Sequence, residues 1–307
     1  MATPLARLSG PPIGPTIGSR SGRGSLVVGA PVGPRPDRHR EFVPNATLSE
    51  REDVTPLVAR YVVNPDAPVP PFEPGQYFSL GFEIDARLVL RPYSTASPRG
   101  ATQALEFLIR RVPAGTFTPE LWQAAVGDRV WIGPPKGLFM LKPNDSRTHL
   151  LVSSGTGISP FMSMLDELLS GADESAAPGS VADGDGARRP AAPVGPRVVV
   201  AHGVSYAPEL AYRQRLESLA AGDPRLTYVP TVSRPDAPEN FGWTGRLGRV
   251  ESVLEEVCGE LRLDPSDTVA YLCGNPEMVA RSREVLSGLG FAADAVIHEN
   301  YWTTVAA

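Results

Sequence analysis

Hydrophobic residues follow two different rhythms along the chain, and the rhythm changes near residue 146. Before that point, short β-branched, aromatic and aliphatic runs are separated by Gly, Pro and Asp, at 54–63, 75–82, 86–94, 104–112 and 128–133. A single short helix is predicted at 118–125, with Thr118 as its N-cap and Pro119 at its first position. Five or six strands with so little helix predict a small antiparallel barrel over 46–145.

After residue 146, strands and helices alternate. Apolar runs typical of buried strands occur at 148–154, 197–203, 226–234, 268–274 and 295–302. Segments with helical spacing lie between them, at 160–169, 207–220, 246–257 and 276–289. This alternation predicts βαβ units and a parallel sheet over 146–307, with ligands bound at the carboxyl ends of the strands.

Two segments lack either rhythm. Residues 1–45 are rich in Gly, Pro and Arg, and we expect a disordered tail there. Residues 170–196 contain no aromatic and almost no large aliphatic side chain, although they separate two well-patterned segments. We therefore interpret 170–196 as a flexible surface insertion and not as a domain boundary.

Composition and charge exclude several classes of protein. A formal net charge of −5 argues against general affinity for nucleic acid or for a membrane surface. Two cysteines cannot build a disulfide framework or ligate an iron–sulfur cluster, and the four histidines show no metal-ligand spacing. No apolar run approaches the roughly 20 residues that span a bilayer, and no secretory signal is recognisable. A cytoplasmic location without membrane insertion is expected.

Two strand-to-helix junctions are candidates for binding chemistry. In "SSGTGISPF" (153–161), Gly155 and Gly157 would let the backbone approach a phosphate, and Pro160 suits the first turn of a helix. The same pattern also fits an ordinary Gly-rich turn. In "LCGNPEM" (272–278), Cys273 is either a small buried hydrophobe or a neighbour of the bound group. Two such junctions on one sheet are stronger support than either alone.

Three arginines stand at further strand ends. Arg234 and Arg246 could grip a 2′-phosphate on a dinucleotide, although either could also be a solvated surface charge. Arg91 lies in "RPYSTASP" (91–98), where a guanidinium, an aromatic ring and hydroxyls follow an apolar run. This stretch is either a structural turn or a site for an anion and a flat ring.

Taken together, five motifs closely resemble the ferredoxin–NADP reductase family, and its bacterial ferredoxin/flavodoxin branch most. They are "RPYS" (91–94), "GTFT" (115–118), "GTGISP" (155–160), "CGNPEM" (273–278) and "ENYW" (299–302), in the family's order over 46–302. The resemblance implies an antiparallel six-stranded FAD-binding barrel, followed by a five-stranded parallel α/β domain that binds NADP. The active site would lie in the cleft between them.

The resemblance also assigns roles toward FAD. Arg91 would bind the pyrophosphate, Tyr93 would lie against the isoalloxazine, Ser94 would reach its N5 edge and Trp302 would stack on the adenine. The implied FAD-binding residues are Arg91, Pro92, Tyr93, Ser94, Leu108, Ile109, Arg110, Thr116, Phe117, Thr118, Thr156 and Trp302.

Toward NADP, the resemblance implies a pyrophosphate loop and a 2′-phosphate clamp made by Arg234 and Arg246. The implied NADP-binding residues are Thr156, Gly157, Pro160, Arg234, Arg246, Cys273, Gly274 and Met278. Cys273 and Glu299 would lie near the nicotinamide, so Ser94, Cys273 and Glu299 are the candidate catalytic residues. Ser205 stands where members of this branch often carry a basic residue.

The function implied is hydride transfer from NADPH to flavin N5, followed by release of single electrons to ferredoxin or flavodoxin. Arginines near the flavin, Arg87 and Arg99, could steer an acidic carrier. One alternative is the reductase component of an oxygenase system without its own iron–sulfur domain. Others are a non-catalytic flavin- or nucleotide-binding redox sensor, and a scaffold that recruits partners through its tail.

Overall fold

The computed structural model describes residues 43–170, 181–182, 188–189 and 195–300. The predicted tail falls outside them except for 43–45, as do most of the predicted insertion at 170–196 and Trp302. Within the insertion, the short strands β8 (Val181–Ala182) and β9 (Arg188–Arg189) pair antiparallel. The described residues all belong to one compact unit.

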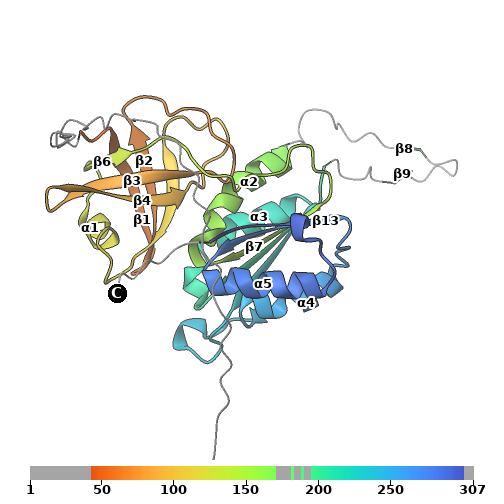
Figure 1. The fold of residues 1–307 in the computed structure, drawn as a ribbon. Coiled ribbons are helices and arrows are strands. Elements are labelled where there is room, and N and C mark those ends of the chain that lie inside the picture. Colours follow the sequence, from red (N-terminus) through yellow and green to blue (C-terminus); the bar gives the residue numbers. More distant parts are fainter. Residues whose placement is uncertain (1–42, 171–180, 183–187, 190–194, 301–307) are drawn as a thin grey trace, which may run out of the picture. The chain divides into compact units, whose positions relative to one another are not determined.

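The first half of that unit is a six-stranded antiparallel barrel, as predicted (Figure 1). Its strands run in the order β4-β3-β6-β1-β2-β5, and a bridge between Thr95 and Phe107 brings the end of β4 to β5. Its core is aromatic, with Phe72, Phe78 and Phe107 in edge-to-face contact. The strands are β1 (Ala46–Thr55), β2 (Val58–Pro65), β3 (Tyr77–Ile84), β4 (Arg87–Ser94), β5 (Leu105–Arg110) and β6 (Arg129–Ile132).

Two local predictions in the barrel are wrong. The apolar run 54–63 is not one strand, because the chain turns at Pro56 and Leu57, and the run holds the end of β1 and most of β2. The N-cap position of the helix α1 (Thr118–Gln123) is Phe117 and not Thr118, and no side chain caps the helix. The Thr118 hydroxyl instead bonds the Val112 backbone, accepting from its N–H at 2.8 Å and donating to its carbonyl at 3.1 Å.

The second half is an α/β sheet in the order β12-β11-β10-β7-β13-β14, parallel throughout. The five predicted strands are present, and a sixth, β12, adds two residues beside Thr231 and Val232. The strands are β7 (Thr148–Ser154), β10 (Val198–Val204), β11 (Leu226–Val232), β12 (Arg246–Leu247), β13 (Thr268–Gly274) and β14 (Val296–Asn300).

Helices cover both faces of this sheet (Figure 1). The helices α2 (Ser159–Ser170) and α3 (Arg213–Gly222) pack on one face, while α4 (Val250–Glu260) and α5 (Pro276–Gly288) pack on the other. The predicted helix 207–220 is broken, because a 3₁₀ turn, η2 (Ala207–Glu209), precedes α3 and Tyr212 has a φ of 62°.

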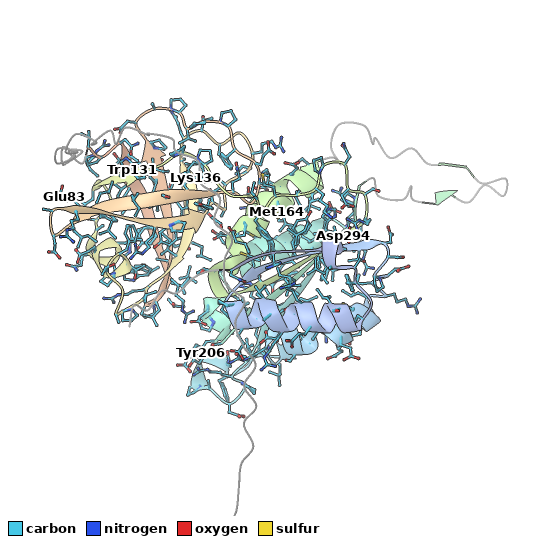
Figure 2. All side chains as sticks on the ribbon, viewed as in Figure 1. Glu83, Trp131, Lys136, Met164, Tyr206 and Asp294 are labelled. Atoms are coloured by element: carbon cyan, nitrogen blue, oxygen red, sulfur yellow. The ribbon has the colours of Figure 1, made fainter. Side chains whose placement is uncertain are left out.

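The barrel and the sheet share one apolar cluster. Leu108 of β5 is buried with Leu151 of β7 and Phe161 of α2. Phe139 belongs to the same cluster, and Met164, labelled in Figure 2, reaches Gly75 from α2. Among the described residues, no helix is long and apolar enough to cross a membrane, and no group of side chains could hold a metal ion.

Candidate functional site

The RPYS motif forms the end of β4, an edge strand. The Arg91 guanidinium is exposed and donates to the Thr116 hydroxyl at 3.1 Å and to the Leu90 carbonyl at 2.8 Å. Pro92 is exposed, whereas Ser94 is buried. The Tyr93 ring lies 5.8 Å from the Phe117 ring, and burial raises the pKa of its phenol. The fold therefore brings the Arg91 guanidinium, the Thr116 hydroxyl and the protonated phenol of Tyr93 to one edge of the barrel.

The GTFT motif (115–118) meets the RPYS motif from the loop before α1, where the Thr116 hydroxyl accepts from Arg91. Phe117 is buried, and no side chain caps the first turn of α1, so backbone N–H groups there remain available to a ligand. The predicted β5 residues point in two directions, as expected for a strand. Ile109 belongs to the barrel core, Leu108 to the core shared with the sheet, and Arg110 is exposed.

The GTGISP motif forms the 3₁₀ turn η1 (Gly155–Ile158) between β7 and α2. A Cβ on Gly157 would overlap the carbonyl of Cys273, so only glycine fits between the two strand ends. Gly155 has a φ of 53° with open space around it. Thr156 is half-buried beside it, and Pro160 is buried in the first turn of α2.

Beneath this turn lies His202, which sequence reasoning did not select. Its Nε2 is 3.0 Å from the Gly155 carbonyl, and its Nδ1 is 3.4 Å from the Tyr228 hydroxyl. Complete burial lowers the pKa of His202 to about 4, so the imidazole is neutral at pH 7. A neutral ring that donates from Nε2 and accepts at Nδ1 satisfies both contacts. His202 thus holds the carbonyl that begins the turn.

The CGNPEM motif is tied directly to the first junction. The Ser154 hydroxyl accepts from the backbone N–H and the side-chain amide of Asn275, each at 3.1 Å. Asn275 in turn caps α5 by accepting from the Met278 N–H at 2.8 Å. Gly274 has a φ of 156°, and a Cβ there would overlap the Ser154 hydroxyl. Sequence reasoning missed Ser154 and Asn275, although Asn before Pro is a familiar helix-start pattern.

The two remaining catalytic candidates lie side by side at the carboxyl edge. Cys273 of β13 is fully buried and stands in register with Glu299 of β14. Burial raises the pKa of Glu299 to about 7, and its Oε2 atom has no hydrogen-bond partner among the described residues. A shielded carboxyl with an open acceptor position fits a polar ligand group at this edge.

The two arginines of the predicted clamp have different surroundings. The Arg234 guanidinium lies 5.3 Å from the Tyr206 ring centre and donates to the Tyr206 hydroxyl at 2.8 Å. Arg246 forms ion pairs with Glu256, at 2.7 Å, and with Glu260. Both of these carboxylates belong to α4. Arg234 is therefore available to a phosphate, whereas Arg246 is already neutralised by two glutamates.

Comparison with protein families gives two matches that follow the two halves of the fold. Residues 45–141 match the model described as "Oxidoreductase FAD-binding domain", and residues 151–284 match "Oxidoreductase NAD-binding domain". These matches agree with the grouping of Arg91 and Thr116 on the barrel and with the glycine contacts at the sheet edge, which fit phosphate groups.

Individual relatives extend the comparison. A ferredoxin–NADP reductase of Azotobacter vinelandii is 33% identical over 232 residues, covering 71% of this chain and 80% of the relative. DmpP, the reductase component of a phenol 2-monooxygenase of Pseudomonas sp. strain CF600, is 27% identical over 285 residues, covering 91% and 71%. A Neisseria gonorrhoeae ferredoxin NADP+ reductase, solved with FAD and NADP, shares the fold with a TM-score of 0.65 at 23% identity, covering 84% and 98%.

Proposed function

Because the chain belongs to the ferredoxin–NADP reductase family and carries FAD-binding and NAD-binding oxidoreductase domains, we propose that it moves electrons between NADPH and ferredoxin or flavodoxin. The observation that carries the proposal is the convergence of two half-sites in one chain. Arg91 meets Thr116 on the barrel, and Gly157 meets Cys273 at the sheet edge. The first suits a diphosphate gripped by side chains, and the second suits a phosphate approached by backbone.

FAD supplies the ability to accept a hydride and to release electrons one at a time. On this chain, Arg91 and Thr116 would hold its pyrophosphate, because a guanidinium fork and a hydroxyl already lie within 3.1 Å of each other. Tyr93 would support the ring system, and Ser94 would contact its polar edge. The stacking role of Trp302 stays a prediction, since that residue lies outside the described part of the chain.

For the nucleotide, the turn η1 with Thr156, Gly157 and Pro160 would take the pyrophosphate, held in place by His202 below it. Arg234 would bind the 2′-phosphate, which favours NADPH over NADH. Arg246 would first have to leave Glu256 and Glu260, so we assign the larger share of the grip to Arg234.

Near the nicotinamide, the proposal places Glu299 and Cys273. With a pKa of about 7, the Glu299 carboxyl can hold or give up a proton near neutral pH. Cys273 is buried within the sheet, and its role would be to shape the pocket floor. Gly274 and Met278 would line the same wall, because Met278 packs directly under Gly274.

The carrier would be steered by the arginines around the flavin edge. Arg99 forms ion pairs with Glu73 and Glu167, so its charge is largely neutralised. Arg87 is exposed and forms no ion pair with any described residue. We therefore assign steering of an acidic carrier to Arg87.

A second candidate function is the reductase component of an oxygenase system. It is favoured by the similarity to DmpP, which extends over 91% of this chain. The 307 residues contain two cysteines, both buried, and so cannot themselves ligate an iron–sulfur centre.

Carrier reduction distinguishes the two functions. The FAD-loaded protein should reduce ferredoxin or flavodoxin with NADPH under anaerobic conditions, faster at low salt than at high salt. Arg87→Ala should lose most of that salt dependence, and Arg99→Ala should keep it. Transfer of electrons to an oxygenase ferredoxin, with neither simple carrier reduced, would favour the second candidate. A rate independent of salt in the wild-type protein would overturn the steering role of Arg87.

A further inference from the structure

The segment Ser205–Tyr212, which follows β10, touches both halves of the molecule. Its 3₁₀ turn η2 packs against β1 of the barrel and against η3 (Pro238–Asn240), the turn that follows Arg234. Tyr206, labelled in Figure 2, lies within this segment. The segment Ser205–Tyr212 therefore connects the barrel to the end of the sheet where Arg234 lies.

On the barrel side, the segment is anchored to both ends of β5. The Glu209 carboxylate is 7% exposed and forms an ion pair with Arg110 at 3.0 Å. Its other oxygen accepts from the Ser205 N–H at 3.3 Å. The Tyr212 hydroxyl donates to Glu106 at 2.6 Å, and Arg60 approaches the same carboxylate at 3.1 Å.

These anchors lie on one face of the strand. Glu106, Leu108 and Arg110 alternate with residues of the barrel core, and Leu108 is buried in the cluster shared with the sheet. The strand between the two anchors holds Leu108, Ile109 and Arg110, which the family resemblance implies as FAD-binding residues. Any shift of the segment relative to Glu106 and Arg110 is therefore a shift relative to the flavin.

On the nucleotide side, the segment is bound by Asn240. Its side-chain amide donates to the Ser205 carbonyl at 2.9 Å and to the Arg234 carbonyl at 2.7 Å. Its oxygen accepts from the Ala207 N–H at 2.6 Å, and the residue is 4% exposed. Asn240 thus fixes Arg234 to the same segment that Glu209 fixes to the barrel.

Tyr212 makes its hydrogen bond to Glu106 from an unfavourable backbone conformation, which contacts with other residues must stabilise. Tyr212 has a φ of 62° and a ψ of 8°, which a non-glycine residue adopts at a cost in free energy. The phenol remains a donor, because burial and the charge of Glu106 raise its pKa well above the usual value. The bond to Glu106 is one contact that holds this conformation.

We propose that Glu209 and Asn240 are positioning residues, which together fix the Arg234 phosphate subsite relative to the flavin-lining strand β5. This inference rests on the proposed function, because it concerns the span between the two ends of the same dinucleotide. Hydride transfer requires that the nicotinamide lies over the flavin while Arg234 holds the 2′-phosphate. The distance between Arg234 and the strand β5 therefore affects the rate of hydride transfer. Glu209 sets that distance, and Asn240 sets the shape of the phosphate subsite.

Substitution of Glu209 should therefore mainly lower the rate of flavin reduction, and substitution of Asn240 should mainly weaken phosphate binding. In Glu209→Ala the phosphate subsite stays intact but is released from β5. The limiting rate of flavin reduction by NADPH should fall about tenfold or more, because small misplacements of reacting groups are costly. The dissociation constant of 2′-phospho-AMP, which occupies only the phosphate end, should change less than threefold. In Asn240→Ala that constant should rise about tenfold, in line with the loss of buried hydrogen bonds.

Hydrogen–deuterium exchange provides a readout without nucleotide. In the FAD-loaded protein, Glu209→Ala should speed exchange in 205–210, and Asn240→Ala should do so in 234–241 as well. Asp66→Asn breaks an exposed pair with Arg129 on the barrel and is the matched control, expected to change neither readout. Glu209→Gln keeps one acceptor and should fall between wild type and Glu209→Ala.

Unchanged exchange and an unchanged limiting rate in Glu209→Ala would overturn the inference. So would equal losses of rate and of 2′-phospho-AMP affinity in both variants, since that pattern reflects general loosening. If Glu209→Ala fails to retain FAD, Tyr212→Phe, which removes one hydroxyl, carries the same test. If NADPH does not reduce the flavin of the wild-type protein, the proposed function is contradicted. The exchange comparison would still decide whether Glu209 and Asn240 stabilise the segment Ser205–Tyr212.

Discussion

The two halves of the candidate site are built by different means. On the barrel, Arg91 is an exposed side chain on an edge strand, and among the described residues it bonds Thr116 and the carbonyl of its neighbour Leu90. On the sheet, the site is shaped by backbone, with Gly157 against Cys273 and Gly274 against Ser154. We therefore expect the first half to fold without Arg91, whereas a change of shape in the second would disturb the strands that form it.

The largest effect is expected where the backbone approach is closest. Gly157→Ala places a methyl group onto the Cys273 carbonyl, so the strand ends must separate. We expect a loss of about 3 kcal/mol in the free energy of unfolding, typical of severe overpacking, together with loss of 2′-phospho-AMP binding. Urea unfolding and calorimetry measure the two quantities.

Gly155→Ala is the matched control within the same turn. Its Cβ would meet open space, and the cost is confined to a φ of 53°. We expect about 1–2 kcal/mol from that backbone conformation. Equal destabilisation by both substitutions would show that close approach at Gly157 does not matter.

The next largest effect concerns FAD on the barrel. Arg91→Ala should weaken FAD binding by about 10²-fold, since charged hydrogen bonds contribute about 1.5–3 kcal/mol. The unfolding of the FAD-free protein should hardly change, because Arg91 is exposed. Arg87→Ala, four residues earlier on the same face of β4, is the control and should retain FAD. Strong destabilisation of FAD-free Arg91→Ala would break the contrast between the two halves.

A smaller effect separates the two arginines of the nucleotide half. Arg234→Ala should raise the dissociation constant of NADPH about tenfold and leave that of NADH unchanged, because only NADPH carries the 2′-phosphate. Arg246→Ala should change NADPH binding less than twofold, since Arg246 already pairs with Glu256 and Glu260. Fluorescence titration of both nucleotides tests this, and a larger effect from Arg246 would reverse our assignment.

The smallest effect is a pH dependence of the free energy of unfolding, caused by Glu299. The pKa of Glu299 is about 7 in the folded protein against an ordinary value of 4.5, so folding takes up a proton between these limits. The resulting stability is complete below pH 4.5, declines as the pH rises and is lost above about pH 7. The change is about 1 kcal/mol after allowance for partial exposure. Glu299→Gln should remove it, and an identical pH profile in that variant would place the titration elsewhere.

The sequence predicted the parts of the fold that follow regular apolar patterns. The five long parallel strands and the aromatic barrel strands are confirmed. The strand β1 escaped prediction because it is largely polar and pairs through its backbone with β2. The break before α3 was not predicted, because Tyr212 adopts a positive φ that is stabilised by contacts with residues far away in the sequence, such as Glu106.

The site shows the same division. Motif spacing selected Arg91, Gly157 and Cys273 as candidates, because each lies within a local pattern of loop and strand. The partners of Arg246, and the contacts made by His202, join residues far apart in the chain. Such contacts depend on which strands become neighbours, and no local pattern encodes them.

The most direct test of the account is anaerobic reduction of the purified, FAD-loaded protein by NADPH and by NADH, followed by the visible absorbance of the flavin. We predict that NADPH bleaches the flavin completely and at lower concentration than NADH does. A protein that purifies without a flavin and binds none, or one whose flavin NADPH leaves oxidised, would contradict the account.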